Sequence, residues 1–399
     1  MKKLIVILVI ICLAFSVFAV YGKSEAPSEE SPVAPETDSG AAAEGEEIVP
    51  VKTVDYDSIY ALHEPDEVVA HVGDEEITWA EYFYMVFSNA KYFENQFSMY
   101  QMYYGLQLDW TSSMSDDPED TFAAYAVSAA EDQIKQPIAI MAYAKENGIE
   151  LSQENIDAMN EQLESEKLSV LGEGATDEAF NEFLAGIYLT REMYDEMLLS
   201  SAYYRENFTH TYGEDGVLVS DEDALQYLLD NSYMRADHIL FKTVDDNYQP
   251  YEESVVAEKK ALAEQCAAEL AEIENEEERI ARFYELKTQY TEDGGAVAYP
   301  EGYIFAPGKM VSAFEEGHNS LADNQISGAV ESEYGYHIIL RLPLDPNLVI
   351  EYSSQGTPLT ARSLYADDAY AKLVLELTNK LEMVYVEGFE EPNLLDYLV

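Results

Sequence analysis

Two histidines stand in stretches patterned like β-strands and are, by residue type, strong candidates for chemistry. His238 lies in the segment 235–242 and His337 in the segment 336–342. A neutral imidazole can act as a general acid or base, or it can hold a hydrogen bond inside a core. A histidine on an apolar strand is usually a hydrogen-bonded core residue, so the pattern alone leaves both roles open.

Cysteine, metal and phosphate chemistry are not indicated. Cys12 lies in an apolar run without the small residues that precede a lipid-attachment cysteine, and Cys266 lies in an Ala/Leu-rich helical stretch. Cys266 therefore fits a small buried apolar residue better than a nucleophile. We find no Walker-type phosphate loop, paired-cysteine zinc pattern or EF-hand loop in the sequence, and we expect no cofactor and no metal.

The N-terminus has the layout of an export signal. Two lysines follow Met1, and residues 4–20 are an almost unbroken apolar run with small residues at its end. This predicts a signal peptide over 1–22. The run falls slightly short of the ~20 residues of a spanning helix, and an uncleaved signal anchor is the alternative. Residues 23–57 are rich in Glu, Ser, Pro, Ala and Gly, which predicts a disordered acidic linker.

The charge of the chain excludes one class of partner. There are 78 acidic against 22 basic residues, a formal net charge of -56. Such a surface repels phosphate backbones, so we expect no nucleic-acid partner. It also resists binding to anionic membrane surfaces, which leaves the signal anchor as the only expected membrane contact.

Periodicity and caps predict a mostly helical segment after the linker. Order is expected to begin with a short strand at 68–72. Thr78 and Glu81 then form a capping box that opens a helix, and a further helix over 122–147 ends at Gly148. Ser152 and Ser220 are expected to begin later helices.

Aromatic and Met residues crowd the segment 82–104. They are Tyr82, Phe83, Tyr84, Met85, Phe87, Tyr92, Phe93, Phe97, Met99, Tyr100, Met102, Tyr103 and Tyr104. Two interpretations stay open: a helical core, or an adaptable apolar surface for unfolded chains.

The pattern changes near residue 231. A strand over 235–242 is followed by helices over 254–274 and 276–289, a Gly/Pro-rich segment over 293–308, a short helix over 311–317 and a strand over 336–342. The tail returns to helix at 364–383. The fold class is therefore α+β.

Four ordered motifs in this second part carry a family resemblance. Residues 235–240 read RADHIL, 305–315 read FAPGKMVSAFE, 326–330 read ISGAV and 334–339 read YGYHII. Together they resemble the parvulin (rotamase) domains of peptidyl-prolyl isomerases.

The flanks resemble the SurA/PrsA group of exported folding factors. Residues 69–78 read VAHVGDEEIT and 144–149 read AKENGI, which look like two looser motifs of that group. The resemblance implies a helical chaperone domain over 66–230, an inserted parvulin domain over 231–345, and a C-terminal segment, 346–399, that packs on the N-terminal domain.

The resemblance also implies an activity and a site. The activity is cis/trans isomerisation of X-Pro bonds in unfolded secreted polypeptides, with chaperone binding of those polypeptides outside the cytoplasm. The implied catalytic residues are His238, Asp293, Ser332 and His337, with the histidines hydrogen-bonded to each other. The implied substrate-binding residues are Met310 and Phe314, which hold the proline ring, with Phe305 supporting the wall.

Two departures from the family pattern bear on activity. Gly302 stands where relatives often have a pocket-lining Leu, and two interpretations stay open: Tyr303 or Ile304 fills the space, or the pocket is weakened. The loop over 245–249 is acidic, which argues against a phosphoserine preference. A non-enzymatic holdase with a degenerate parvulin domain is therefore the alternative function, and a solute-binding or structural surface protein is the third.

Overall fold

The computed structural model describes residues 52–399, and the predicted signal peptide and most of the predicted linker lie outside them. These residues divide into two compact units. The first comprises the described residues up to Thr211 together with Ala369–Val399, and the second comprises Tyr212–Asp368. In the part of the chain that the structure describes, no helix is both long and apolar enough to cross a membrane.

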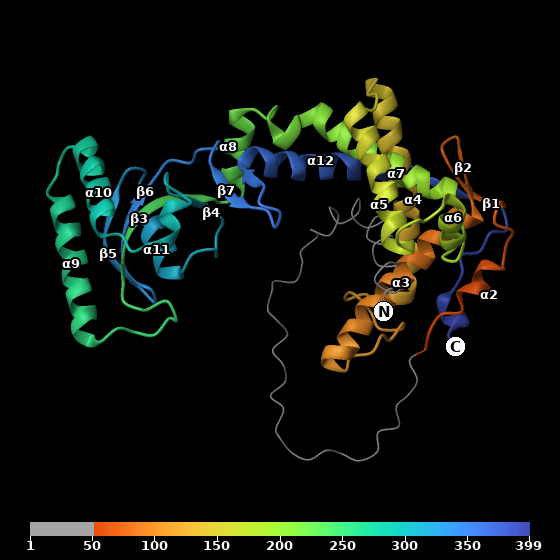
Figure 1. The fold of residues 1–399 in the computed structure, drawn as a ribbon, viewed down its shortest axis with the longest axis horizontal. Coiled ribbons are helices and arrows are strands. Elements are labelled where there is room, and N and C mark those ends of the chain that lie inside the picture. The colour runs from red at the N-terminus through yellow and green to blue at the C-terminus, as the bar shows by residue number, and fades with distance from the viewer. Residues whose placement is uncertain (1–51) are drawn as a thin grey trace, which may run out of the picture. The chain divides into compact units, whose positions relative to one another are not determined.

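The first unit is mostly helical (Figure 1). Thr78 and Glu81 form the predicted capping box at the start of α3, and Gly148 ends α4 in a left-handed conformation. Ser152 caps α5 as predicted. The helices of this unit are α2 (Tyr56–Tyr60), α3 (Trp79–Tyr104), α4 (Phe122–Asn147), α5 (Gln153–Leu171), α6 (Asp177–Ala185) and α7 (Arg191–Tyr212), and the end of α12 (Ala361–Asn379) joins them.

Both ends of the first unit contain structure that the sequence patterns did not predict. Order begins before the strand at 68–72, because Val54 bridges to Leu398 and α2 follows directly. The predicted helix over 364–383 ends at Asn379, and Met383–Tyr385 instead form a strand, β9. This strand pairs antiparallel with β1 (Val68–Val72), which also pairs with β2 (Glu75–Thr78).

The aromatic helix α3 divides into two halves with opposite environments. Its first half is core, where Trp79, Tyr82 and Phe83 are buried. Its last turns are open to solvent, where Met102, Tyr103 and Tyr104 are 77%, 75% and 73% exposed. The first half is therefore the helical core that one interpretation predicted, and the second half is an exposed apolar surface whose use for unfolded chains stays a prediction.

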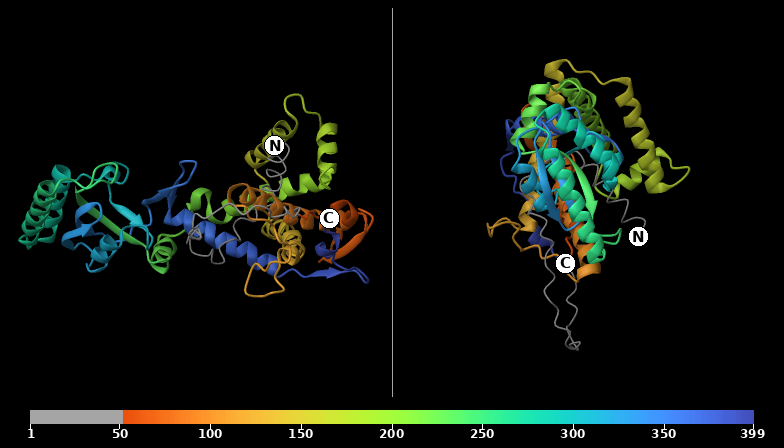
Figure 2. Two further views of the ribbon diagram at one scale, coloured as in Figure 1. Left: turned by 90° about the horizontal axis from the view of Figure 1, so that it is seen from below. Right: turned by 90° about the vertical axis from the view of Figure 1, so that its left-hand side faces the viewer.

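The second unit is built on a four-stranded antiparallel sheet of order β4-β3-β6-β5. Helices α9 and α10 cover one face of this sheet and α11 lies on the other (Figures 1 and 2). The sheet strands are β3 (Met234–Lys242), β4 (Tyr303–Phe305), β5 (Ile326–Ser332) and β6 (Gly335–Arg341). The other elements include α8 (Asp221–Asp230), α9 (Glu253–Ala271), α10 (Glu276–Tyr290), α11 (Ser312–Asn319), β7 (Val349–Tyr352) and β8 (Pro358–Thr360).

Alternation along β3 and β6 separates the two faces of the sheet. Ile239 and Phe241 point to the helical face, where they pack with Cys266 of α9 and Phe283 of α10. Cys266 is buried there, as its sequence context predicts. The residues between them, such as His238, point to the other face, and the site lies there.

Candidate functional site

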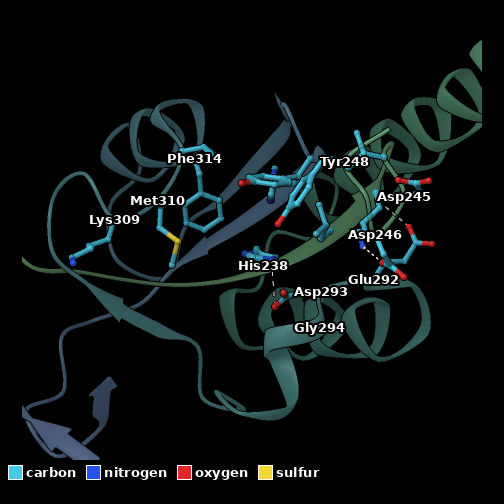
Figure 3. Close-up of a pocket in the computed structure, with 16 residues that line it drawn as sticks. His238, Asp245, Asp246, Tyr248, Glu292, Asp293, Gly294, Lys309, Met310 and Phe314 are labelled. Atoms are coloured by element: carbon cyan, nitrogen blue, oxygen red, sulfur yellow. Dashed lines mark hydrogen bonds and ion pairs between the residues drawn. The ribbon is translucent and has the colours of Figure 1, made fainter. Parts of the chain in front are cut away.

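A hollow of about 450 Å³ opens on the face of the sheet that α9 and α10 leave uncovered (Figure 3). We call it the rotamase pocket. Five of the sequence-predicted site residues line it: His238, Asp293, Met310, Phe314 and His337. Its other lining residues are Leu240, Lys242, Val244, Asp245, Asp246, Tyr248, Glu292, Gly294, Lys309, Val311 and Tyr334.

The two remaining predicted site residues, Ser332 and Phe305, contact residues that line the pocket. Ser332 is within hydrogen-bond distance of His337, with 2.7 Å between Oγ and Nε2. Phe305 is buried on β4, and its ring centre lies 6.0 Å from that of Phe314. Neither residue lines the hollow.

Sheet register places the two histidines side by side. Residues His238 and Ile339 are partners across β3 and β6, as are Leu240 and His337, so the two histidines are diagonal neighbours on one face. Their rings meet edge to face, with centroids 5.2 Å apart and planes at 88°. They do not hydrogen-bond each other, because both ring nitrogens of His238 and Nδ1 of His337 are buried without a hydrogen-bond partner among the described residues. The expected histidine–histidine hydrogen bond is therefore absent.

Burial keeps both imidazoles neutral. Desolvation, helped by the neighbouring His238, lowers the pKa of His337 to about 3. Desolvation also lowers the pKa of His238, although Asp293 and Asp237 act in the opposite direction. At neutral pH the two rings therefore form an uncharged floor to the pocket.

Asp293 lies beside His238 and is held there by a hydrogen bond from Tyr303. The Tyr303 hydroxyl donates to Asp293 Oδ2 at 2.5 Å, and the same oxygen lies 3.5 Å from His238 Nε2. The Tyr303 ring stacks on His238 with centroids 5.8 Å apart. Burial, together with the hydrogen bond to Asp293, raises the pKa of Tyr303, so its hydroxyl stays a proton donor.

The segment before Asp293 is tied to the edge of β3. Strand β4 pairs with β3 only as far as Ala236. Beyond that point Leu240 N–H donates to Thr291 Oγ1 at 3.2 Å, and Lys242 N–H donates to Glu292 Oε2 at 2.8 Å. Glu292 N–H in turn donates to the Leu240 carbonyl at 2.8 Å. These bonds satisfy the open strand edge and hold the next residue, Asp293, opposite His238.

A buried ion pair supports the same strand from the helical face. Asp237 Oδ1 accepts the backbone N–H of His238 at 2.7 Å and lies 2.6 Å from Lys287 Nζ of α10. Asp237 is only 1% exposed, so its charge depends on this one cation. The sequence patterns predicted neither this ion pair nor the hydrogen bond from Tyr303 to Asp293. A lysine among the apolar residues of α10, next to Phe283 and Leu286, was the available signal.

The other wall of the pocket is apolar. Phe314 is 2% exposed, and its ring centre lies 5.2 Å from that of His238 and 5.4 Å from that of His337. Met310 lies beside it, as Figure 3 shows. Glu315 Oε1 accepts the backbone N–H groups of Gly308 and Met310 at 2.9 and 3.0 Å, which fixes the loop that carries Met310.

Gly302 does not belong to the pocket wall. Its φ is +85°, and a Cβ there would lie 2.7 Å from the Ala236 carbonyl oxygen and 3.2 Å from Leu342 Cδ1. Only glycine allows this close approach to β3. A larger side chain at this position would therefore meet β3 before it could extend the pocket wall. Tyr303 and Ile304 do not line the hollow either, although Tyr303 reaches it through Asp293.

Comparison with known proteins agrees with this geometry. Residues 238–342 match the rotamase family, described as the PPIC-type PPIASE domain. The foldase protein PrsA of Geobacillus sp. (strain WCH70) is 29% identical over 186 residues, 41% of this chain and 66% of that protein. The chaperone SurA of Burkholderia lata is 37% identical over 128 residues, 31% of this chain and 28% of that protein.

The matched segments span less than two thirds of each of these relatives. The crystal structure of PrsA from Bacillus subtilis is 17% identical and covers 68% of this chain and 93% of its own, with a TM-score of 0.23. Residues 238–342 are therefore a rotamase domain of the PPIC type, and the chain that carries it is similar to the PrsA and SurA proteins over the shares given above.

Proposed function

We propose that this protein is an exported foldase whose rotamase pocket accelerates cis/trans isomerisation of X-Pro bonds in unfolded polypeptides. The observation that supports this best is the pairing, in one hollow, of an apolar wall of Met310 and Phe314 with a neutral polar floor. The relatives named foldase and chaperone point to the same role.

Isomerisation of an X-Pro bond makes and breaks no covalent bond, so the site must bind the proline residue and favour rotation about its imide bond. Rotation about the imide is opposed by a barrier of ~18–20 kcal/mol because it destroys amide resonance. The apolar wall would hold the proline ring. The planar imide is more polar than the twisted one, so contact with the apolar wall would favour the twisted state.

The histidines would act by shaping the floor. Their unpartnered ring nitrogens are buried, and both rings are neutral, so neither is offered as a proton donor to a bound peptide. Asp293, partly exposed and held by Tyr303, would present its carboxyl group to the bound peptide beside His238. Ser332 would hold His337 in place.

The helical unit would bind the same unfolded polypeptides. The solvent-exposed end of α3, from Met99 to Tyr104, offers flexible and aromatic side chains that adapt to varied partners. We propose that residues 66–230 and 346–399 serve this chaperone role around a rotamase domain over 231–345. The alternative function is a holdase that binds the same polypeptides without catalysing their isomerisation.

Export is the third element of the proposal. The predicted signal and the similarity to PrsA and SurA support an extracytoplasmic protein. Most mature chains should begin near residues 20–24, and an intact Met1 would favour the signal anchor. Recovery of the protein from the cytoplasm alone would contradict export.

The activity is tested on the purified full chain with a short X-Pro peptide. We expect faster cis-to-trans relaxation than in buffer, and loss of the effect when Met310 and Phe314 are both replaced by Ala. Suppression of aggregation of an unfolded protein is measured in parallel. A folded chain that suppresses aggregation but leaves relaxation unchanged would establish the holdase instead.

A further inference from the structure

The helical unit carries a hollow of about 740 Å³, which is larger in volume than the rotamase pocket. Its lining residues lie outside the segment 238–342 that matches the rotamase family. It is lined by β2, the start of α3, the second half of α4 and α7. A second hollow of about 110 Å³ shares lining residues Ile77, Glu81, Pro137, Ile138 and Glu196 with it, so the two are continuous. We call them together the acidic groove. Its volume falls in the range of about 300–1,000 Å³ typical of ligand clefts.

The floor of the acidic groove is apolar and built from adaptable side chains. Met85, Met141, Met193 and Met197 line it, together with Ile138. Met141, Met197 and Ile138 are only partly buried, so apolar surface remains available to a ligand. Methionine reshapes easily around different partners, which suits a site that takes varied sequences.

The rim of the groove carries surplus negative charge. Glu75, Glu76, Glu81 and Glu196 line it, against Lys145 alone among the lining basic residues. Glu81 is engaged by the Thr78 backbone N–H at 2.7 Å, whereas Glu196 has neither a hydrogen bond nor an ion pair among the described residues. Desolvation, with the added repulsion of Glu81, Glu192 and Glu75, raises the pKa of Glu196.

We propose that the acidic groove binds a segment of unfolded polypeptide in which a bulky apolar side chain stands next to a lysine or arginine. The apolar side chain would be buried on the methionine floor. The cation would lie against Glu196 with its aliphatic stem along the apolar wall. No proline is required, and acidic segments are repelled. This deepens the proposed chaperone role and rests on it.

The test measures binding of labelled, proline-free peptides to the purified full chain by fluorescence anisotropy. One peptide alternates Leu with Lys, a second replaces each Lys by Glu, and a third replaces each Leu by Ser. Glu196→Lys and Met141→Gln are the groove variants. Glu173→Lys makes the same change of charge at an exposed glutamate outside the groove that has no hydrogen bond or ion pair among residues 52–399, and it is the matched control.

We expect the wild-type chain to bind the Leu/Lys peptide and to bind the other two peptides at least about tenfold more weakly. Glu196→Lys should lower the affinity for the Leu/Lys peptide by about tenfold. Met141→Gln should weaken binding of the Leu/Lys peptide severalfold, and Glu173→Lys should leave it unchanged. Binding should also fall with rising salt, because the charge contribution is screened. Equal binding of all peptides, or binding unaffected by Glu196→Lys, overturns the proposal.

Two further readouts separate this proposal from the proposed isomerase. Relaxation of a short X-Pro peptide should be the same in wild type and groove variants. If wild type fails to catalyse relaxation but binds the Leu/Lys peptide at the groove, the isomerase proposal fails and the groove stands. Concentration-dependent dimerisation of the wild type that is lost in Glu196→Lys would assign the groove to a second copy of the chain and overturn the peptide proposal.

Discussion

The rotamase pocket and the acidic groove differ in what fixes their walls. The pocket is built on paired strands, and Asp293 is positioned by backbone bonds to the edge of β3. The groove is built between β2 and three helices, with methionines on its floor and Glu196 left unpaired among the described residues. A reaction through one twisted imide geometry needs the first kind of site. Binding of varied segments tolerates the second.

We therefore expect a substitution near the rotamase pocket, in the unit Tyr212–Asp368, to lower stability or activity more than a comparable substitution in the helical unit, which comprises the described residues up to Thr211 and Ala369–Val399.

The largest effect is expected from removal of the buried cation. Lys287→Ala leaves Asp237 charged and buried, which should lower the unfolding free energy of the rotamase unit by roughly 3–5 kcal/mol. Lys145→Ala removes an exposed lysine and should change stability by about 0.5 kcal/mol or less. Hydrogen exchange of β3 peptides during denaturant unfolding of the full chain reports the first effect. Equal costs for the two variants would contradict the contrast.

The next effect separates two glycines with positive φ. Gly148→Ala meets open space, so it should cost only the left-handed penalty of about 1–2 kcal/mol. Gly302→Ala should cost more, because its Cβ would meet the Ala236 carbonyl oxygen at 2.7 Å. Gly302→Leu should lower isomerase activity. Thermal unfolding measures the stability of the two Ala variants, and the X-Pro assay measures the activity of Gly302→Leu. A gain of activity in Gly302→Leu would show that a side chain at this position contributes to the pocket wall.

A third prediction concerns pH. The pKa of His337 is about 3 in the folded chain, below the ordinary value of 6.5, so the unfolded chain binds the proton first as pH falls. Its contribution to stability is complete above pH ~6.5 and is lost towards pH ~3, at up to about 1.4 kcal/mol per pH unit.

Replacement of the imidazole isolates this contribution. Between pH 7 and pH 5 the unfolding free energy of His337→Gln should fall less steeply than that of wild type. Parallel slopes in the two proteins, measured by denaturant unfolding at each pH, would contradict the lowered pKa of His337 in the folded chain.

The smallest effect is expected in kinetics. Met310→Ala should lower kcat/KM for an X-Pro peptide severalfold with a small change in Tm, because Met310 is only partly buried and touches the proline ring in the proposed complex. Met141→Ala in the groove should leave kcat/KM unchanged. An unaltered kcat/KM in Met310→Ala would remove this side chain from the gripping wall.

The sequence by itself determined features that depend on neighbours along the chain. The cap of α3 at Thr78, the end of α4 at Gly148 and the starts of α5 and α8 at Ser152 and Ser220 are all where the patterns predict. A cap needs one side chain and the backbone two or three residues away, so it can be predicted from the local sequence. Ordered motifs likewise identified the rotamase domain.

Only the tertiary structure decided the features that join distant residues. Packing buried Trp79 and left Tyr103 exposed on one uniformly aromatic helix, and it drew Met383–Tyr385 into a strand beside β1. It brought Tyr303 to Asp293 and placed Gly302 against Ala236 rather than in the pocket. Burial and cross-strand contact depend on the whole arrangement of the chain, so no local pattern of residue types specifies them.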